Sequence, residues 1–121
     1  METSQTGGQT LLILTNLPDQ ASAQALATTL VSARLAACVN MLGPCRSVYR
    51  WQGAIESAQE VPLLIKTTAQ RYADLEAAIR AAHPYELPEI IAVPIAHGLA
   101  EYLGWIDAET CAESPDGKLP T

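Results

Sequence analysis

Residues 83–98 concentrate the side chains that could do chemistry. They hold both histidines, two carboxylates and three of the eight prolines, set around one apolar run. His83 stands just before a proline, where it either caps a helix as a cation or binds a metal. The metal role needs a second donor, for which there are three candidates: Cys38, Glu86 and Tyr85. The other histidine, His97, precedes Gly98 and is expected to fix a turn.

The three cysteines favour a reducing compartment over a disulfide framework. The chain has an odd number of cysteines, none of them in C-x-x-C spacing: Cys38, Cys45 and Cys111. Cys38 alternates onto the same strand face as Asn40, and a free cysteine in such a place is usually a small buried hydrophobe. Its thiolate would also suit copper, and together with an imidazole it would suit zinc. Cys45 and Cys111 are interpreted as structural.

Lys66 interrupts an otherwise apolar strand. A buried ammonium group is unfavourable unless it is paired, so two interpretations remain open. The side chain either extends to the open face of a sheet, or it binds an anion or a carboxylate in a pocket. Glu60 and Glu89 are the candidate carboxylate partners.

Four of the six aromatic residues lie near predicted turns or helices: Tyr49, Trp51, Tyr102 and Trp105. Alternation puts Tyr49 and Trp51 on one face of a long hairpin. They are interpreted either as packing at a subunit interface or as a stacking pocket for a small planar ligand.

Composition excludes several classes of function. The net charge is −6 and the pI is near 4.7, and the seven basic residues are scattered, which argues against nucleic acid and membrane surfaces. No run approaches the roughly 18–20 apolar residues of a membrane span, and residues 1–10 do not resemble a signal peptide. No nucleophile elbow, phosphate loop or zinc-protease motif is present. We therefore expect a cytoplasmic binding protein and no enzyme.

The periodicity predicts a single α+β domain over residues 1–121, with an ordered core at about 10–110 and flexible tails. Strands are predicted at residues 10–15, 36–51 (bent at Gly43-Pro44), 54–68 and 87–95, the last as an edge strand because of its prolines. Helices are predicted from Asp19 to about 33, from 68 to 82, and after Gly98. The order is βαββαβ with an extra C-terminal helix, which is the ferredoxin-like pattern. Leu11–Thr15 and Leu63–Thr67 read as one repeated unit, with Lys66 in the place of Leu14.

The two long strands, joined at Gln52-Gly53, imply an assembly. Two arms of about fifteen residues at ~3.3 Å each span about 50 Å, well beyond a normal strand. The overhanging part of this hairpin needs a partner, and an identical subunit is the simplest one.

Several motifs in this order resemble the CutA family of divalent-cation tolerance proteins, and the match runs from about Leu11 to Ala108. The motifs are Arg34-Leu-Ala-Ala-Cys-Val-Asn40, Ser47-x-Tyr-x-Trp-x-Gly53, Glu60 with Leu64-Ile-Lys-Thr67, His83-Pro-Tyr-Glu-x-Pro-Glu-Ile90, and His97-Gly-x-x-x-Tyr-Leu-x-Trp105. Three positions depart from the family pattern: Gln52, Ala54 and Cys45.

The resemblance implies a tight homotrimer, similar in architecture to the PII signalling proteins, that is associated with copper and other divalent cations and has no obligatory cofactor. It makes Cys38 and His83 the metal-ligand candidates. It also implies a cluster of ligand-binding positions near subunit boundaries: Lys66, Tyr85, Glu89, Trp51 and Tyr102.

Two alternatives remain. One is a PII-like small-molecule sensor, and the other is a trimeric scaffold for a partner protein, each with incidental metal binding. Because only Gln52-Gly53 joins the two long strands, ATP binding of the PII type is not expected.

Overall fold

A computed structural model describes residues 8–111 of the chain. In order, its elements are β1 (Thr10–Leu17), α1 (Gln20–Ser32), β2 (Cys38–Met41), β3 (Cys45–Trp51), β4 (Ala54–Thr68), the short 3-10 turn η1 (Ala69–Arg71), α2 (Tyr72–Ala82), β5 (Ile91–Pro94) and α3 (Ala100–Glu109). The predicted ferredoxin-like order with an added C-terminal helix is confirmed. Most of the predicted flexible tails lies outside the described residues.

The sheet is antiparallel and has the order β2-β4-β1-β5, with β3 paired to the far part of β4. The two copies of the repeated unit are direct partners at its centre. Leu11 lies opposite Thr67, Ile13 opposite Ile65, and Thr15 opposite Leu63. The repeat is therefore also the central strand pair of the fold.

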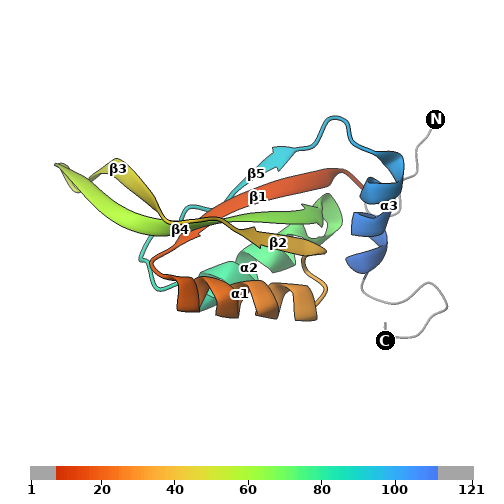
Figure 1. The fold of residues 1–121 in the computed structure, drawn as a ribbon, viewed down its shortest axis with the longest axis horizontal. Coiled ribbons are helices and arrows are strands. Elements are labelled where there is room, and N and C mark those ends of the chain that lie inside the picture. Colours follow the sequence, from red (N-terminus) through yellow and green to blue (C-terminus); the bar gives the residue numbers. More distant parts are fainter. Residues whose placement is uncertain (1–7, 112–121) are drawn as a thin grey trace.

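Both long helices pack on one face of the sheet, and the other face is left open (Figure 1). Alternation in β1 and β4 sends every second side chain toward the helices. The core consists of such residues together with the apolar stripes of α1 and α2, including Ile13, Leu17, Leu26, Leu30, Leu63, Ile65, Leu75 and Ile79. Each fully buried Leu or Ile contributes about 1.5–3 kcal/mol of hydrophobic stabilisation.

Arg34 ties the end of α1 to α3. Helix α1 begins at an Asp19 cap, whose carboxylate accepts the Ser22 amide N–H at 2.8 Å. After the helix ends, Arg34 adopts a left-handed backbone with φ +60°. Its guanidinium donates to the carbonyl oxygens of Ala108 and Cys111, both at 3.1 Å. These carbonyls lie at the C-terminal end of α3, where a cation is favoured.

Two predicted strands differ from the observed ones. The segment 36–51 is two strands, because after Leu42, whose N–H still donates to the Pro62 carbonyl oxygen, Gly43 and Pro44 leave the ladder and Pro44 has no N–H to donate. The predicted strand 87–95 is only Ile91–Pro94, since a bend at residues 85–87 and irregular backbone at 88–90, which includes Pro88, precede it. Its predicted position at the edge of the sheet is confirmed.

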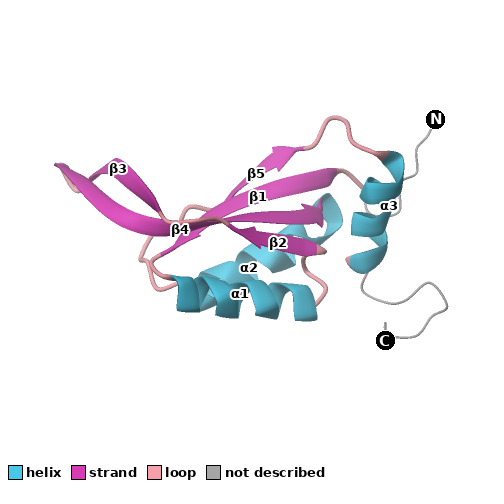
Figure 2. Cartoon of the chain, viewed as in Figure 1, coloured by secondary structure: helices cyan, strands magenta, loops and turns pink. Residues whose placement is uncertain are grey.

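The hairpin of β3 and the first half of β4 extends beyond the body as a two-stranded ribbon (Figure 2). Gln52 and Gly53 both have positive φ, +51° and +84°, as a tight hairpin turn requires. Val48 and Ile55 are about 70% exposed on this ribbon. The predicted overhang is present and apolar residues remain uncovered on it.

Candidate functional site

His83 closes α2 and is held by its neighbours on both ring nitrogens. The Tyr85 amide N–H donates to its Nδ1 at 3.2 Å. Nδ1 is therefore the acceptor, and the ring proton sits on Nε2, which donates to the Asn16 carbonyl oxygen at 2.6 Å. His83 is buried and its ring centroid lies 4.7 Å from that of Tyr85. In this arrangement the imidazole positions the segment that follows α2.

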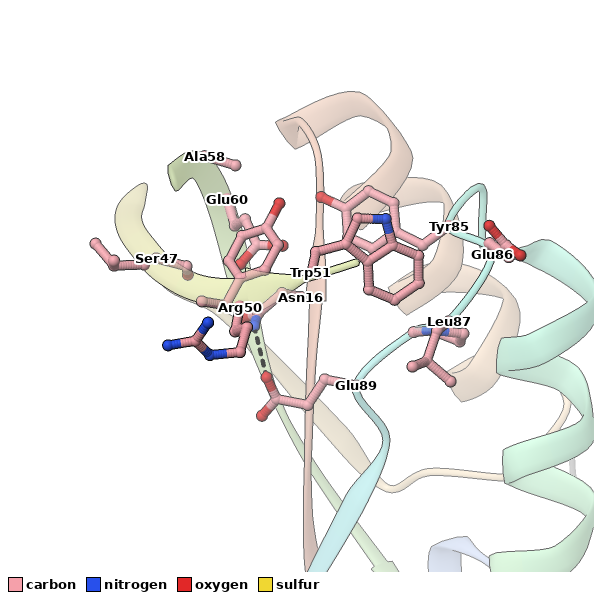
Figure 3. Close-up of a pocket in the computed structure, with 13 residues that line it drawn as sticks. Asn16, Ser47, Arg50, Trp51, Ala58, Glu60, Tyr85, Glu86, Leu87 and Glu89 are labelled. Carbon is pink, nitrogen blue, oxygen red and sulfur yellow. Dashed lines mark hydrogen bonds between the residues drawn. The ribbon is translucent and has the colours of Figure 1, made fainter. Parts of the chain in front are cut away.

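That segment forms one wall of a pocket of about 870 Å³. The ribbon forms the opposite wall, so strand residues 47–51, Ala58 and Glu60 face residues 85–89 across it (Figure 3). Asn16 at the end of β1 lies between the two walls. Its side-chain amide donates to Glu89 Oε1 at 3.0 Å. Three of the predicted ligand-binding residues thus line one pocket: Trp51, Tyr85 and Glu89.

Tyr85 and Glu60 line opposite walls of the pocket. Burial, and secondly interaction with the Glu60 carboxylate, raise the pKa of Tyr85 to about 12. Glu60 is only 7% exposed. The phenol and the carboxylate are therefore close enough to influence each other across the pocket.

Lys66 lies on the open face of the sheet, far from that pocket. Its Nζ donates to Asn40 Oδ1 at 2.7 Å and lies 5.8 Å from the centre of the Tyr102 ring. Neither of the two candidate carboxylates, Glu60 and Glu89, pairs with Lys66 among the described residues. Glu60 is six residues away along β4, about 20 Å, and Glu89 is bonded to Asn16. The interpretation of Lys66 as a side chain extended over the open face therefore agrees with the structure.

The two predicted metal donors do not meet within one subunit. Cys38 pairs with Lys66 on the open face, whereas His83 bonds Asn16, which lies opposite Pro62. The two places are about 13 Å apart along β4. The Cys38 thiol is free and half-buried, 3.9 Å from Asn40 Oδ1. Within residues 8–111, no group of three or more His, Cys, Asp or Glu side chains is placed to hold a metal ion.

The open face is an apolar surface formed by the side chains of Leu12, Leu14, Leu64, Ile91 and Val93. Cross-strand partners share a face, and these five are partners or neighbours on the side away from the helices. None of them is buried, and Ile91 and Val93 are about half exposed. Cys38 and its cross-strand partner Lys66 lie on the same face. The Lys66 ammonium group lies near the Tyr102 ring, whose centroid is 5.5 Å from that of the stacked Trp105 ring.

Sequence reasoning missed the two asparagines that organise these sites. Asn16 holds His83 and Glu89, and Asn40 holds Lys66. Asn40 alternates onto the same strand face as Cys38, and this pattern could have indicated its role from the sequence. Nothing in the local sequence pattern marks Asn16. None of the helices in the described part of the chain is long and apolar enough to cross a membrane.

Comparison with known proteins identifies the family to which the chain belongs. A family model described as CutA1 divalent ion tolerance protein matches residues 11–109. The divalent-cation tolerance protein CutA of Thermus thermophilus is 44% identical over 99 residues, covering 82% of this chain and 96% of that protein. Among solved structures, CutA from Xylella fastidiosa aligns with a TM-score of 0.83 at 47% identity, covering 86% of this chain and 100% of that one. CutA1 from Oryza sativa aligns with a TM-score of 0.85 at 33% identity, covering 90% and 100%. The resemblance seen in the sequence motifs is thereby confirmed, and the chain belongs to the CutA1 family of divalent-ion tolerance proteins.

Proposed function

We propose that this chain works as a homotrimer that binds copper or another divalent cation and has no catalytic role. The observation that carries the proposal is the position of Cys38 on the open face. An uncovered apolar sheet face is normally the contact surface of a partner. When identical subunits cover this face, Cys38 lies at a subunit boundary, where neighbouring subunits can supply the donors that one subunit lacks.

The ribbon supports the same assembly. The outer edge of β3 has no strand partner among the described residues, and its backbone groups are available for pairing. Val48 and Ile55 keep apolar surface exposed on the ribbon. A neighbouring subunit provides both a strand partner and apolar cover, in a closed ring that leaves no edge free.

Cys38 and His83 are the proposed metal donors, and they differ in availability. The Cys38 thiol is free and suits soft cations such as Cu(I). The His83 ring must give up either the Asn16 carbonyl or the Tyr85 amide before it binds a metal. We therefore propose Cys38 as the first donor. A reducing compartment such as the cytoplasm would keep this thiol available.

Metal titration tests the two donors separately. We expect reduced protein to bind Cu(I), Cu(II) or Zn(II), and Cys38→Ser to weaken that binding about tenfold or more, since even outer-shell changes at metal sites have effects of this size. His83→Ala is measured in parallel. Cys45→Ser is the matched control, because Cys45 is also free and half-buried. Weak binding that neither Cys38→Ser nor His83→Ala changes would show that the metal site is wrongly placed.

The pocket between the ribbon and residues 85–89 favours a second candidate function, a small-molecule sensor. Trp51, Tyr85 and Glu89 line this pocket and are proposed to contact the ligand. Its volume of about 870 Å³ is within the range typical of small-molecule sites. Lys66 and Tyr102 lie on the open face, away from this pocket. They form a separate proposed cluster that would bind an anionic group.

A further inference from the structure

The charge around the pocket is unbalanced. Three carboxylates line it, those of Glu60, Glu86 and Glu89, with one guanidinium, that of Arg50. Arg50 alternates with Tyr49 and Trp51 along β3, and Figure 3 shows its guanidinium on the side away from Tyr85 and Leu87. Between residues 8 and 111, ion pairs within 4.0 Å form only at Arg34–Glu109 and Arg71–Asp74. The pocket therefore carries net negative charge, and none of its carboxylates is neutralised by an ion pair within the described part of the chain.

Glu60 is the most informative of the three carboxylates. It is 93% removed from solvent, forms no ion pair among the described residues, and has the neutral phenol of Tyr85 near it, which leaves its acceptor capacity free. A buried carboxylate without a cation nearby is unfavourable unless something supplies the missing positive charge. This residue lines the pocket, so a cation bound there would reach it.

Aromatic rings complete the recognition chemistry. Tyr49, Trp51 and Tyr85 line the same pocket, with apolar side chains of Val48, Leu87 and Pro88 around them. The faces of Trp and Tyr rings attract ammonium and guanidinium groups, and Trp does so best. Carboxylates combined with aromatic faces are the typical lining for an organic cation, since the rings also bury its methylene groups.

We propose that this pocket binds a small free organic cation with an ammonium or guanidinium group on an apolar chain. This inference rests on the second candidate function, in which the pocket is a ligand site, and it names the ligand class. A bare metal ion fits less well, because within the described part of the chain these carboxylates do not form a metal-binding group. The cation lies between Glu60 and Glu89, with its chain against Trp51.

Calorimetric titration with three probes of similar length tests the ligand class: agmatine as the cation, 1,5-pentanediol as a neutral molecule and glutarate as the anion. We expect saturable binding of agmatine, one molecule per chain, which weakens as salt rises, and no binding of the other two. If agmatine does not bind and either of the others binds in a Trp51-dependent way, the cation inference is overturned while the sensor function stands. If none of the three probes binds, both the cation inference and the sensor function are overturned. The same conclusion holds if a lysine or arginine of a second copy of the chain fills the pocket.

Matched variants locate the binding. Glu60→Gln keeps the shape of the side chain but removes its charge, and should weaken agmatine binding about tenfold or more, because it removes a charge-assisted contact. Trp51→Leu should do the same through the lost ring face. Glu56→Gln is the control, since Glu56 is exposed on β4 and does not line the pocket. Unfolding midpoints confirm that each variant is folded, and equal binding by wild type and folded Glu60→Gln contradicts the inference.

Discussion

His83 shows how neighbouring groups decide the role of a versatile side chain. From the sequence it was either a cationic helix cap or a metal ligand. In the fold it ends α2, yet its ring is neither an exposed cap nor a free ligand, because the Asn16 carbonyl and the Tyr85 amide occupy both nitrogens. The Tyr85 partner was predictable, since it lies two residues away. The Asn16 partner was not, because it comes from a strand 67 residues earlier.

Tyr85 gives a titration that can be measured. Its pKa is raised to about 12, first by burial and second by the Glu60 carboxylate. The neutral phenol is therefore favoured in the folded state, and this stabilisation is fully present below about pH 10, the ordinary pKa of tyrosine, and is lost as pH rises through 12. We expect absorbance at 295 nm to show one phenol ionising near pH 12 in wild type and not in Tyr85→Phe.

Comparison with Glu60→Gln separates the two causes. Because burial is the larger one, this variant should lower the pKa of Tyr85 only in part, to a value still above 10. Tyr72 also has a raised pKa, mainly through burial, so the signal of Tyr85 must be taken as the difference between wild type and Tyr85→Phe. A Tyr85 that ionises near pH 10 would contradict the burial of its phenol beside Glu60.

At the scale of elements, Arg34 holds α3 against the rest of the chain. Its side chain caps the last carbonyls of α3, while its own backbone is in the left-handed region. Ile106 is the one fully buried apolar side chain of α3 within the described residues. The helix therefore depends strongly on this polar connection.

Two substitutions at this position separate backbone strain from capping. Arg34→Ala and Arg34→Gly both lose the guanidinium bonds, but glycine adopts positive φ freely, so Arg34→Ala should be less stable by about 1 kcal/mol. Urea unfolding measures this difference. In both variants hydrogen exchange should speed up in residues 100–109 relative to wild type, and equal protection of α3 in all three proteins would contradict the capping role.

The elements themselves were largely predictable, and the exceptions have a physical cause. Periodicity predicted the position of β4 and the order of all the elements, since buried faces impose their spacing on the sequence. The prediction of one strand over residues 36–51 was wrong in its continuity, although the bend was placed at Gly43-Pro44, where the strand is in fact interrupted. The uninterrupted partner β4 pairs with both β2 and β3, so the sequence pattern on either side of the break is that of one continuous pairing.

At the scale of the whole molecule, the sequence predicted less of the site than of the fold. Trp51, Tyr85 and Glu89 line one pocket as a group, whereas Lys66 and Tyr102 lie together elsewhere. The family resemblance implied that all five positions form one cluster, whereas within the subunit they form two groups. The position of the ribbon against residues 85–89 decides which of them meet, and that position depends on contacts between residues far apart in the sequence.

The central claim is that identical subunits cover the open face. Light scattering of the purified chain measures it most directly, together with a Val93→Glu variant on that face and a Val31→Glu control on α1. The two valines are 46% and 42% exposed in the subunit, so a single chain should tolerate either change equally. We expect a mass three times the 12.9 kDa chain for wild type and Val31→Glu, and a loss of this species for Val93→Glu. A wild-type monomer at micromolar concentration, or a Val93→Glu protein that assembles as wild type does, would contradict the claim.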